Sequence, residues 1–104
     1  MIPQEIQDKL PQIRELCKAH DVQYMYLFGS AARGEMKENS DYDFYMKIDV
    51  VSEDYKRYSS NLFSIYDKLE KLFDRKIDVV TTLMNPNKYF MQSIDRTKQK
   101  LYEG

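Results

Sequence analysis

The chain of 104 residues has the length of one domain, and we expect a single domain over residues 1–104 with a modest core. Its 16 Lys and Arg residues against 17 Asp and Glu residues give a net charge of -1, which argues against binding of long DNA or RNA, because such proteins carry a basic excess. The lone cysteine, Cys17, excludes a disulfide framework, which suits a cytoplasmic location. No stretch of the sequence is apolar over the length of a membrane span, so we expect no association with a membrane.

The first predicted elements are an amphipathic helix and a strand. Helical spacing of apolar residues over positions 4–19 predicts one helix, or two short helices divided at Pro11; these apolar residues are Ile6, Leu10, Ile13 and Leu16. Residues 22–28 are almost wholly apolar, are rich in β-forming residues and are followed by Gly29. This run predicts a central strand covered on both faces.

The middle of the chain contains a second strand and the clearest helix. Residues 41–48 alternate between apolar and polar side chains, which predicts a strand with one polar face. Residues 53–73 keep apolar side chains at helical spacing, and Ser52 precedes them as the expected helix cap, with Glu53 and Asp54 in the first turn. We therefore expect a long amphipathic helix, with the charged residues 68–76 on its solvated face and in the loop that follows.

The last third of the chain completes the sheet. Residues 77–83 predict a third strand, Pro86 is expected at the first position of a helix that ends near residue 95, and Leu101 with Tyr102 indicates a short edge strand. The order is helix, strand, short helix, strand, long helix, strand, helix. This order predicts an α/β (α+β) fold, a small mixed sheet flanked by helices.

The turn after the first strand is suited to phosphate. Its sequence is Gly29-Ser30-Ala31-Ala32-Arg33-Gly34. Gly29 permits a tight backbone path, and the residues after it can open a short helix whose free N–H groups attract phosphate. The Ser30 hydroxyl adds a donor, and Arg33 is the nearest cation for a leaving pyrophosphate. Arg33 can equally do no more than tie its loop to a neighbouring acid.

Acidic residues follow on the next two strands. Asp41 and Asp43 are two residues apart, so they project from the same strand face with Cα atoms about 7 Å apart. Two carboxylates together with a triphosphate suit Mg²⁺. A two-ion site usually needs a further carboxylate, and Asp78 is the best candidate because it interrupts an apolar strand. Asp78 would also accept the proton of an acceptor hydroxyl, unless it merely ends its strand.

These residues form one signature. Gly29-Ser30 is followed after ten residues by Asp41-x-Asp43, and the same signature includes Gly34, Ser40 and, on the later strand, Asp78. The signature resembles that of the DNA polymerase β-type nucleotidyltransferase superfamily, and specifically the minimal nucleotidyltransferases of bacteria and archaea. The resemblance spans residue 4 to about residue 95. It departs from the family where aromatic side chains replace branched aliphatic ones around the acidic pair, at Tyr42, Phe44 and Tyr45.

The resemblance implies a polymerase β-like fold, ATP as the donor, and two Mg²⁺ ions held by three catalytic acids, Asp41, Asp43 and Asp78. It also implies that Gly29 and Ser30 contact the triphosphate. Many members of the family pair with HEPN-domain proteins. The chain is in this respect similar to an antitoxin that adenylylates a tyrosine of a HEPN ribonuclease toxin.

Two other functions are compatible with the same signature. A nucleotidyltransferase of the antibiotic-modifying kind uses the same core on a small molecule, but it normally has an added helical domain that we do not find here. A noncatalytic binding module would neutralise its partner by occlusion and keep the carboxylates without turnover. Transfer of a nucleotide, or its absence, separates these functions.

We expect structural roles for several other residues. His20 ends the first predicted helix, where a cation suits the helix dipole, and Cys17 is expected in the core rather than as a nucleophile. An apolar group near the last helix can form either a partner-binding patch or part of the core, and we expect the core; it consists of Met84, Tyr89, Phe90 and Met91.

Overall fold

A four-stranded sheet organises the fold in the computed structural model, which describes residues 2–35, 37 and 40–104. The strands are β1 (Val22–Phe28), β2 (Tyr42–Ile48), β3 (Ile77–Thr81) and β4 (Gln99–Glu103), in the order β3-β2-β1-β4. β1 pairs antiparallel with β2 and β4, whereas β2 and β3 are parallel. The central position of β1 and the edge position of β4 confirm two predictions, and the mixed sheet confirms the predicted fold class.

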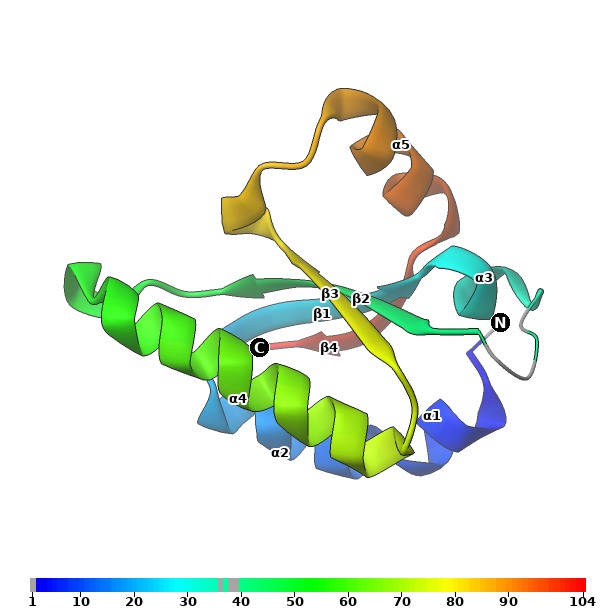
Figure 1. The fold of residues 1–104 in the computed structure, drawn as a ribbon, viewed down its shortest axis with the longest axis horizontal. Coiled ribbons are helices and arrows are strands. Elements are labelled where there is room, and N and C mark those ends of the chain that lie inside the picture. Colours follow the sequence, from blue (N-terminus) through cyan, green and yellow to red (C-terminus); the bar gives the residue numbers. More distant parts are fainter. Residues whose placement is uncertain (1, 36, 38–39) are drawn as a thin grey trace.

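Helices cover the two faces of the sheet unequally. α1 (Gln4–Asp8), α2 (Leu10–Ala19) and α4 (Tyr55–Phe73) lie on one face, and α5 (Lys88–Thr97) lies on the other (Figure 1). The short α3 (Gly29–Arg33) connects β1 to the segment before β2, and two 3-10 turns, η1 (Val51–Glu53) and η2 (Thr82–Met84), precede α4 and follow β3. None of the helices in the described part of the chain is long and apolar enough to cross a membrane.

Of the two alternatives expected for residues 4–19, the structure has the two short helices, but they are not divided at Pro11. α1 and α2 meet at Lys9, which is both the C-cap of α1 and the N-cap of α2. Pro11 therefore lies in the first turn of α2 instead of between two helices. Proline is tolerated there because the first turn of a helix leaves its N–H groups without an intrahelical partner.

Two predicted helix starts are each wrong by two residues. Ser52 does not cap α4, because it lies inside η1 with a φ of 52°; instead the Asp54 side chain accepts a hydrogen bond from the backbone of Arg57 at 3.0 Å. α5 starts at Lys88 and ends at Thr97, and its cap is Asn87, which accepts from the Phe90 backbone N–H at 2.9 Å. In both helices an Asp or Asn side chain closer to the helix than the predicted residue accepts from a free backbone N–H of the first turn.

β3 differs from the buried strand that its apolar sequence predicts. It ends at Thr81, and its burial alternates: Ile77, Val79 and Thr81 are buried, Val80 is half-buried and Asp78 is exposed. Only one face of β3 packs into the main core against α4. The charge of Asp78 therefore needs no burial, and it lies on the opposite face, the side of the sheet that faces α5.

The main core lies between the sheet and the helices α1, α2 and α4. Its fully buried side chains include Ile13, Met25, Phe44, Ile65 and Leu69. Burial of each such side chain contributes about 1.5–3 kcal/mol. The helical spacing in α2 and α4 and the alternation in β2 place these residues on one side, which is why the sequence predicts this core correctly.

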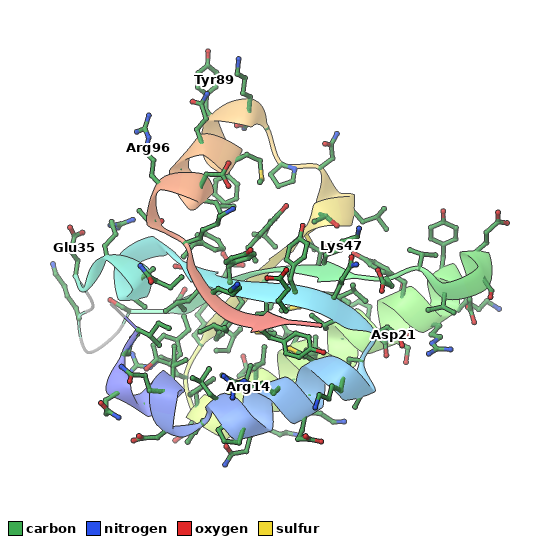
Figure 2. All side chains as sticks on the ribbon, turned by 180° about the vertical axis from the view of Figure 1, so that it is seen from behind. Arg14, Asp21, Glu35, Lys47, Tyr89 and Arg96 are labelled. Carbon is green, nitrogen blue, oxygen red and sulfur yellow. The ribbon has the colours of Figure 1, made fainter. Side chains whose placement is uncertain are left out.

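A smaller core forms on the other face, beneath α5. Phe28, Tyr45 and Ile94 are buried there, so the predicted polar face of β2 is wrong at Tyr45. The expectation that Met84, Tyr89, Phe90 and Met91 pack in the core is confirmed for Met91 and wrong for Met84 and Tyr89. Tyr89 is 82% exposed and points away from the sheet in Figure 2, and Met84 is 52% exposed. α5 contacts the sheet through Ile94 and Met91, and the ring of Phe90 packs edge-on against Phe28 at 5.8 Å.

Candidate active site

Two of the predicted acidic residues lie side by side. Asp43 of β2 and Asp78 of β3 are register partners in the parallel pair. Paired residues project from the same face with Cβ atoms about 5 Å apart, and their strand neighbours Tyr42 and Val79 are buried in the main core on the other face. Both carboxylates thus point to the α5 side of the sheet. β3 thus pairs beside β2, the arrangement in which Asp78 can join the acidic pair.

The third predicted acid, Asp41, lies just before β2. Its side chain is 36% exposed, and its carboxylate lies 3.9 Å from Nζ of Lys76. Backbone pairing continues to this point, because the Tyr42 N–H donates to the Lys76 carbonyl at 3.2 Å. Arg75 donates to the Ser40 carbonyl at 2.8 Å and lies over the Tyr42 ring at 4.8 Å. The start of β3 therefore holds the segment that presents Asp41.

Arg75 and Lys76 were not singled out from the sequence. A signal existed, because two consecutive basic residues stand immediately before the strand that carries the third acid. This signal is weak because both residues belong to the charge-rich run 68–76, which as a whole has the pattern of a solvated surface. Only the parallel pairing of β2 with β3 shows that two of its members face the acidic segment.

The three acids interact electrostatically. Burial, followed by the negative charges of Asp78 and Asp41, raises the pKa of Asp43 to about 6, and the positive charge of Arg33 partly opposes this rise. The largest cause is the half-buried position of the carboxyl group, and the neighbouring negative charges add to it. A bound cation would relieve the repulsion, and carboxylate oxygens are the hard ligands that Mg²⁺ takes, so the donor set fits a divalent cation.

The described side chains do not complete the coordination shell of a metal ion by themselves. Within residues 2–35, 37 and 40–104, no three His, Cys, Asp or Glu side chains gather closely enough to hold a metal ion by themselves. Mg²⁺ usually takes only one or two carboxylates and completes its shell with phosphate oxygens and water. The arrangement is therefore suited to a cation that arrives with a nucleotide.

Gly29 lies directly against Asp43. Phe28, the last residue of β1, is the register partner of Asp43, and Gly29 then turns the chain into α3 with a φ of +73°. A Cβ at position 29 would lie 3.1 Å from Cγ of Asp43 and closer still to its Oδ2. Glycine is needed here both for the backbone conformation and for the space that the carboxylate occupies. The predicted glycine turn thus lies directly beside Asp43, a member of the predicted acidic pair.

Ser30 and Arg33 lie on α3, which starts beside the carboxylates. Phe28 occupies the N-cap and provides no side-chain hydrogen bond, so the first amides of α3 have no capping side chain. Arg33 lowers the pKa of Asp43 by its positive charge, and its Nε donates to Glu35 at 3.1 Å. Arg33 thus forms the hydrogen bond to a neighbouring acid that the structural alternative expects, and its charge also acts on the acidic site.

Two residues that attracted attention in the sequence have structural roles. Cys17 is fully buried, and burial raises the pKa of its thiol to about 12, which removes it as a nucleophile. His20 is buried, and its ring nitrogens contact the Leu16 carbonyl at 2.7 Å and the Ser64 hydroxyl at 2.8 Å. Both predictions agree with the structure.

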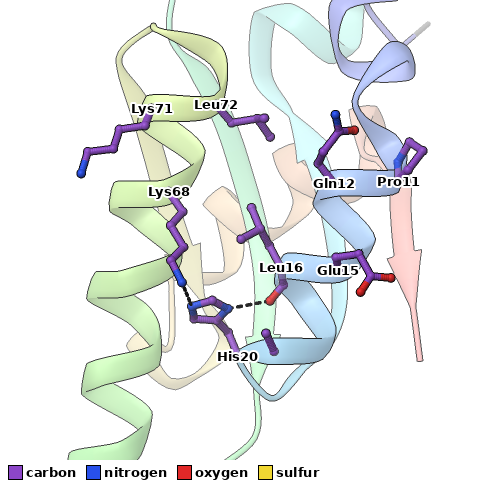
Figure 3. A pocket seen from close by; sticks show the side chains of 9 residues that line it. Pro11, Gln12, Glu15, Leu16, His20, Lys68, Lys71 and Leu72 are labelled. Atoms are coloured by element: carbon purple, nitrogen blue, oxygen red, sulfur yellow. Dashed lines mark hydrogen bonds between the residues drawn. The ribbon is translucent and has the colours of Figure 1, made fainter.

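A pocket of about 750 Å³ lies far from this chemistry in the fold. It is lined by α2 and α4, as Figure 3 shows, with the Lys68 ammonium 3.5 Å from His20 at one side. These helices cover the face of the sheet opposite to the one that carries Asp43 and Asp78. The pocket is therefore not part of the acidic site.

Comparison with known proteins gives consistent results. Residues 11–104 match the family described as "Polymerase beta, Nucleotidyltransferase". Two proteins of Methanocaldococcus jannaschii are similar in sequence. "Putative protein adenylyltransferase MJ1379" is 33% identical over 94 residues, which cover 83% of this chain and 91% of that protein. "Putative protein adenylyltransferase MJ1215" is 35% identical over 68 residues, which cover 65% of this chain and 73% of that protein.

Solved structures share the fold at lower sequence identity. "Structure of putative minimal nucleotidyltransferase" aligns with a TM-score of 0.77 at 22% identity and covers 95% of each chain. "Crystal structure of the toxin-antitoxin with AMP-PNP" aligns with a TM-score of 0.69 at 22% identity and covers 91% of this chain and 73% of that one. At this identity the likeness concerns the fold.

Proposed function

Because the chain belongs to the polymerase beta nucleotidyltransferase family, we propose that this nucleotidyltransferase moves AMP from ATP to a hydroxyl group of a protein, with Mg²⁺ at its acidic site. One observation carries the proposal: Asp43 has Asp78 beside it in register on one side and Gly29 against it on the other. The carboxylate pair that we propose for the metal thereby adjoins the start of α3, whose first amides have no capping side chain.

The acids Asp41, Asp43 and Asp78 hold the cations, for which we propose two Mg²⁺ ions. When bound, Mg²⁺ offsets the charge of the triphosphate and lowers the pKa of the acceptor hydroxyl. Gly29 gives the Asp43 carboxylate the space that it occupies, and the Ser30 hydroxyl donates to the triphosphate. The half-buried setting of Asp43 strengthens these interactions because screening by water is weaker there.

The transfer forms one bond and breaks one. The acceptor oxygen bonds to the α-phosphorus of ATP, the bond from that phosphorus to the bridging oxygen breaks, and pyrophosphate leaves with its electron pair. Asp78 is exposed and accepts the proton that the hydroxyl loses. Arg33, which already acts on the acidic site through its charge, offsets the charge of the leaving pyrophosphate.

The acceptor we propose is a tyrosine of a partner HEPN toxin, which makes this chain an antitoxin. A protein acceptor is supported by the names of the two Methanocaldococcus jannaschii proteins, and a toxin partner by the structural neighbour that is a toxin–antitoxin pair with AMP-PNP. The balanced net charge of -1 supports a partner other than long nucleic acid. The single reduced cysteine, Cys17, supports the cytoplasm as the compartment.

The direct test uses the protein encoded by the neighbouring gene. It is incubated with this enzyme, Mg²⁺ and ATP labelled at the α-phosphate, and the label is followed by electrophoresis and mass spectrometry. We expect one AMP on a tyrosine of the partner. Label on a small molecule instead would identify the antibiotic-modifying type of activity, and tight complex formation without label would identify occlusion.

Variants assign the activity to the acidic site. Asp41→Asn combined with Asp43→Asn removes two metal ligands and abolishes labelling. Asp67→Asn is the control for the loss of a carboxylate outside the site, because Asp67 lies on α4, paired with Lys71 at 2.9 Å on the exposed surface. Transfer that survives the double substitution would remove the proposed metal site from the mechanism.

A further inference from the structure

β3 has an open outer edge. It pairs only with β2 among the described strands, and in Figure 1, which views the sheet from the side of β3, no other element lies in front of it. The Lys76 carbonyl faces β2, where it accepts from Tyr42. Because backbone groups alternate in direction along a strand, those of Ile77, Val79 and Thr81 face outward. No hydrogen bond recorded within the described residues occupies them.

The opposite edge of the sheet is protected. β4 carries Lys100 and Glu103, which form an ion pair at 3.0 Å, and its register with β1 shifts between Met25 and Tyr26. Charges and bulges are the usual means by which proteins prevent another strand from pairing with an edge. The sequence of β3 contains a single charge, Asp78, and that side chain points to the acidic site. The edge of β3 thus remains available for pairing.

An apolar pocket lies under the same edge. It has a volume of about 260 Å³ and lies between α4 and β3, lined by Leu62, Phe63, Tyr66, Val79 and Met84. Phe63 is 74% exposed and Met84 is 52% exposed, which is unusual for large apolar side chains gathered at one place. Sites for small molecules usually measure about 300–1,000 Å³, so this pocket suits a single apolar side chain.

The pocket and the acidic site are connected through one strand. Val79 forms part of the pocket wall, and its neighbour Asp78 stands on the opposite face of β3 beside Asp43. A strand added to this edge would have the same alternation. A residue directly across from Asp78 would have its Cβ about 5 Å away on the acidic face, while the residues before and after it would point to the pocket face.

We infer that the free edge of β3 binds an extended segment of the AMP-accepting protein, which joins the sheet as a fifth strand, presents its hydroxyl beside Asp78 and inserts an adjacent apolar side chain into the pocket at Phe63. This inference rests on the proposed function and specifies its acceptor: a hydroxyl residue flanked by apolar residues in an extended segment. Main-chain hydrogen bonds provide the affinity in this mode of recognition, and the pocket provides the specificity.

The experiment uses nuclear magnetic resonance on the ¹⁵N-labelled chain without ATP or metal. The probe is the peptide Lys-Thr-Leu-Tyr-Leu-Thr-Lys, whose tyrosine is flanked by leucines. We expect shifts at the amides of Ile77, Val79 and Thr81, and slower solvent exchange of these amides. Because no chemistry is involved, an absence of AMP transfer in the enzymatic assay would contradict the proposed function and leave this binding result standing.

Two variants and a second peptide sharpen the test. Phe63→Glu places a charge at the pocket and is expected to weaken peptide binding at least tenfold, whereas Tyr55→Glu, also on an exposed part of α4, changes it less than twofold. A peptide with glutamates in place of both leucines does not bind. Shifts confined to β4 or α5, equal effects of the two variants, or no shifts at millimolar peptide would overturn the inference.

Discussion

Gly29→Ala is the substitution that probes the acidic site most sharply. The backbone at this position has a φ of +73°, and a Cβ there would lie 3.1 Å from Cγ of Asp43 and in collision with its Oδ2. The left-handed conformation costs a non-glycine residue about 1–2 kcal/mol. In a domain of this size each kcal/mol lowers the Tm by about 4–8 °C. The collision in addition moves the Asp43 carboxylate.

Gly34→Ala is a matched control for this change. Gly34 has the same φ of +73°, at the end of α3, but a Cβ there would meet no atom within 4 Å. Alanine at position 34 therefore produces the backbone strain without the collision. A displacement of about 1 Å at a catalytic group can reduce the rate about 100-fold. We expect such a loss for Gly29→Ala and nearly normal turnover for Gly34→Ala.

The assay combines thermal unfolding with initial rates of AMP transfer. Both variants are assayed at a temperature at which each is fully folded, so that stability and activity are separated. We expect similar losses of Tm from strain and a difference of about two orders of magnitude in rate. Equal rates for the two variants would refute the conclusion that Gly29 is required for the position of Asp43.

Three further predictions concern single residues. The pKa of Asp43 rises from 3.8 to about 6 on folding, so its favourable contribution to stability is present below pH 3.8 and is lost as the pH rises through about 6. Asp43→Asn should therefore raise the Tm near neutral pH but leave it unchanged below pH 3.8. Scanning calorimetry of the variant and the unmodified chain at these two pH conditions measures the difference. Tyr58→Phe removes the buried bond to the Thr81 hydroxyl at 2.6 Å and should lower the free energy of unfolding by about 1–3 kcal/mol in urea titrations, while AMP transfer persists. Asp78→Asn should reduce kcat far more than ATP affinity, which steady-state kinetics would contradict if only the KM for ATP rose.

The order of elements could be predicted because its signals are local. The alternation around Asp43 and the apolar run that ends at Gly29 each lie within one strand and its turn, and the structure confirms both elements. The spacing from Gly29 to Asp43 also indicates the site. That the two residues touch follows from the antiparallel register of β1 and β2, which the sequence does not state.

The errors concern partners that are distant in the sequence. Tyr45 occupies a position that reads as polar-facing and is buried because Ile94 of α5, far along the chain, packs on that face. The apolar sequence around Asp78 predicts a buried strand, but β3 lies at the edge of the sheet and Asp78 is exposed on one of its faces. Neither fact can be read from the local pattern, because burial depends on which elements cover each face.

The helix starts show a different limit. Ser52, Glu53 and Asp54 are all acceptable at or near a helix start, so the sequence pattern cannot choose between them. Asp54 is the cap because its side chain accepts from the Arg57 backbone, whereas Ser52 and Glu53 lie in the preceding turn with positive φ values. Local signals thus locate the helix, whereas backbone geometry selects its cap.

The central claim is that Asp41, Asp43 and Asp78 hold a divalent cation against ATP, and calorimetric titration of ATP with and without Mg²⁺ tests it most directly. We predict that Mg²⁺ increases the affinity of the unmodified chain for ATP at least tenfold, and that Asp43→Asn abolishes this increase while Asp67→Asn retains it. An increase of the same size in Asp43→Asn, or none in the unmodified chain, would contradict the account.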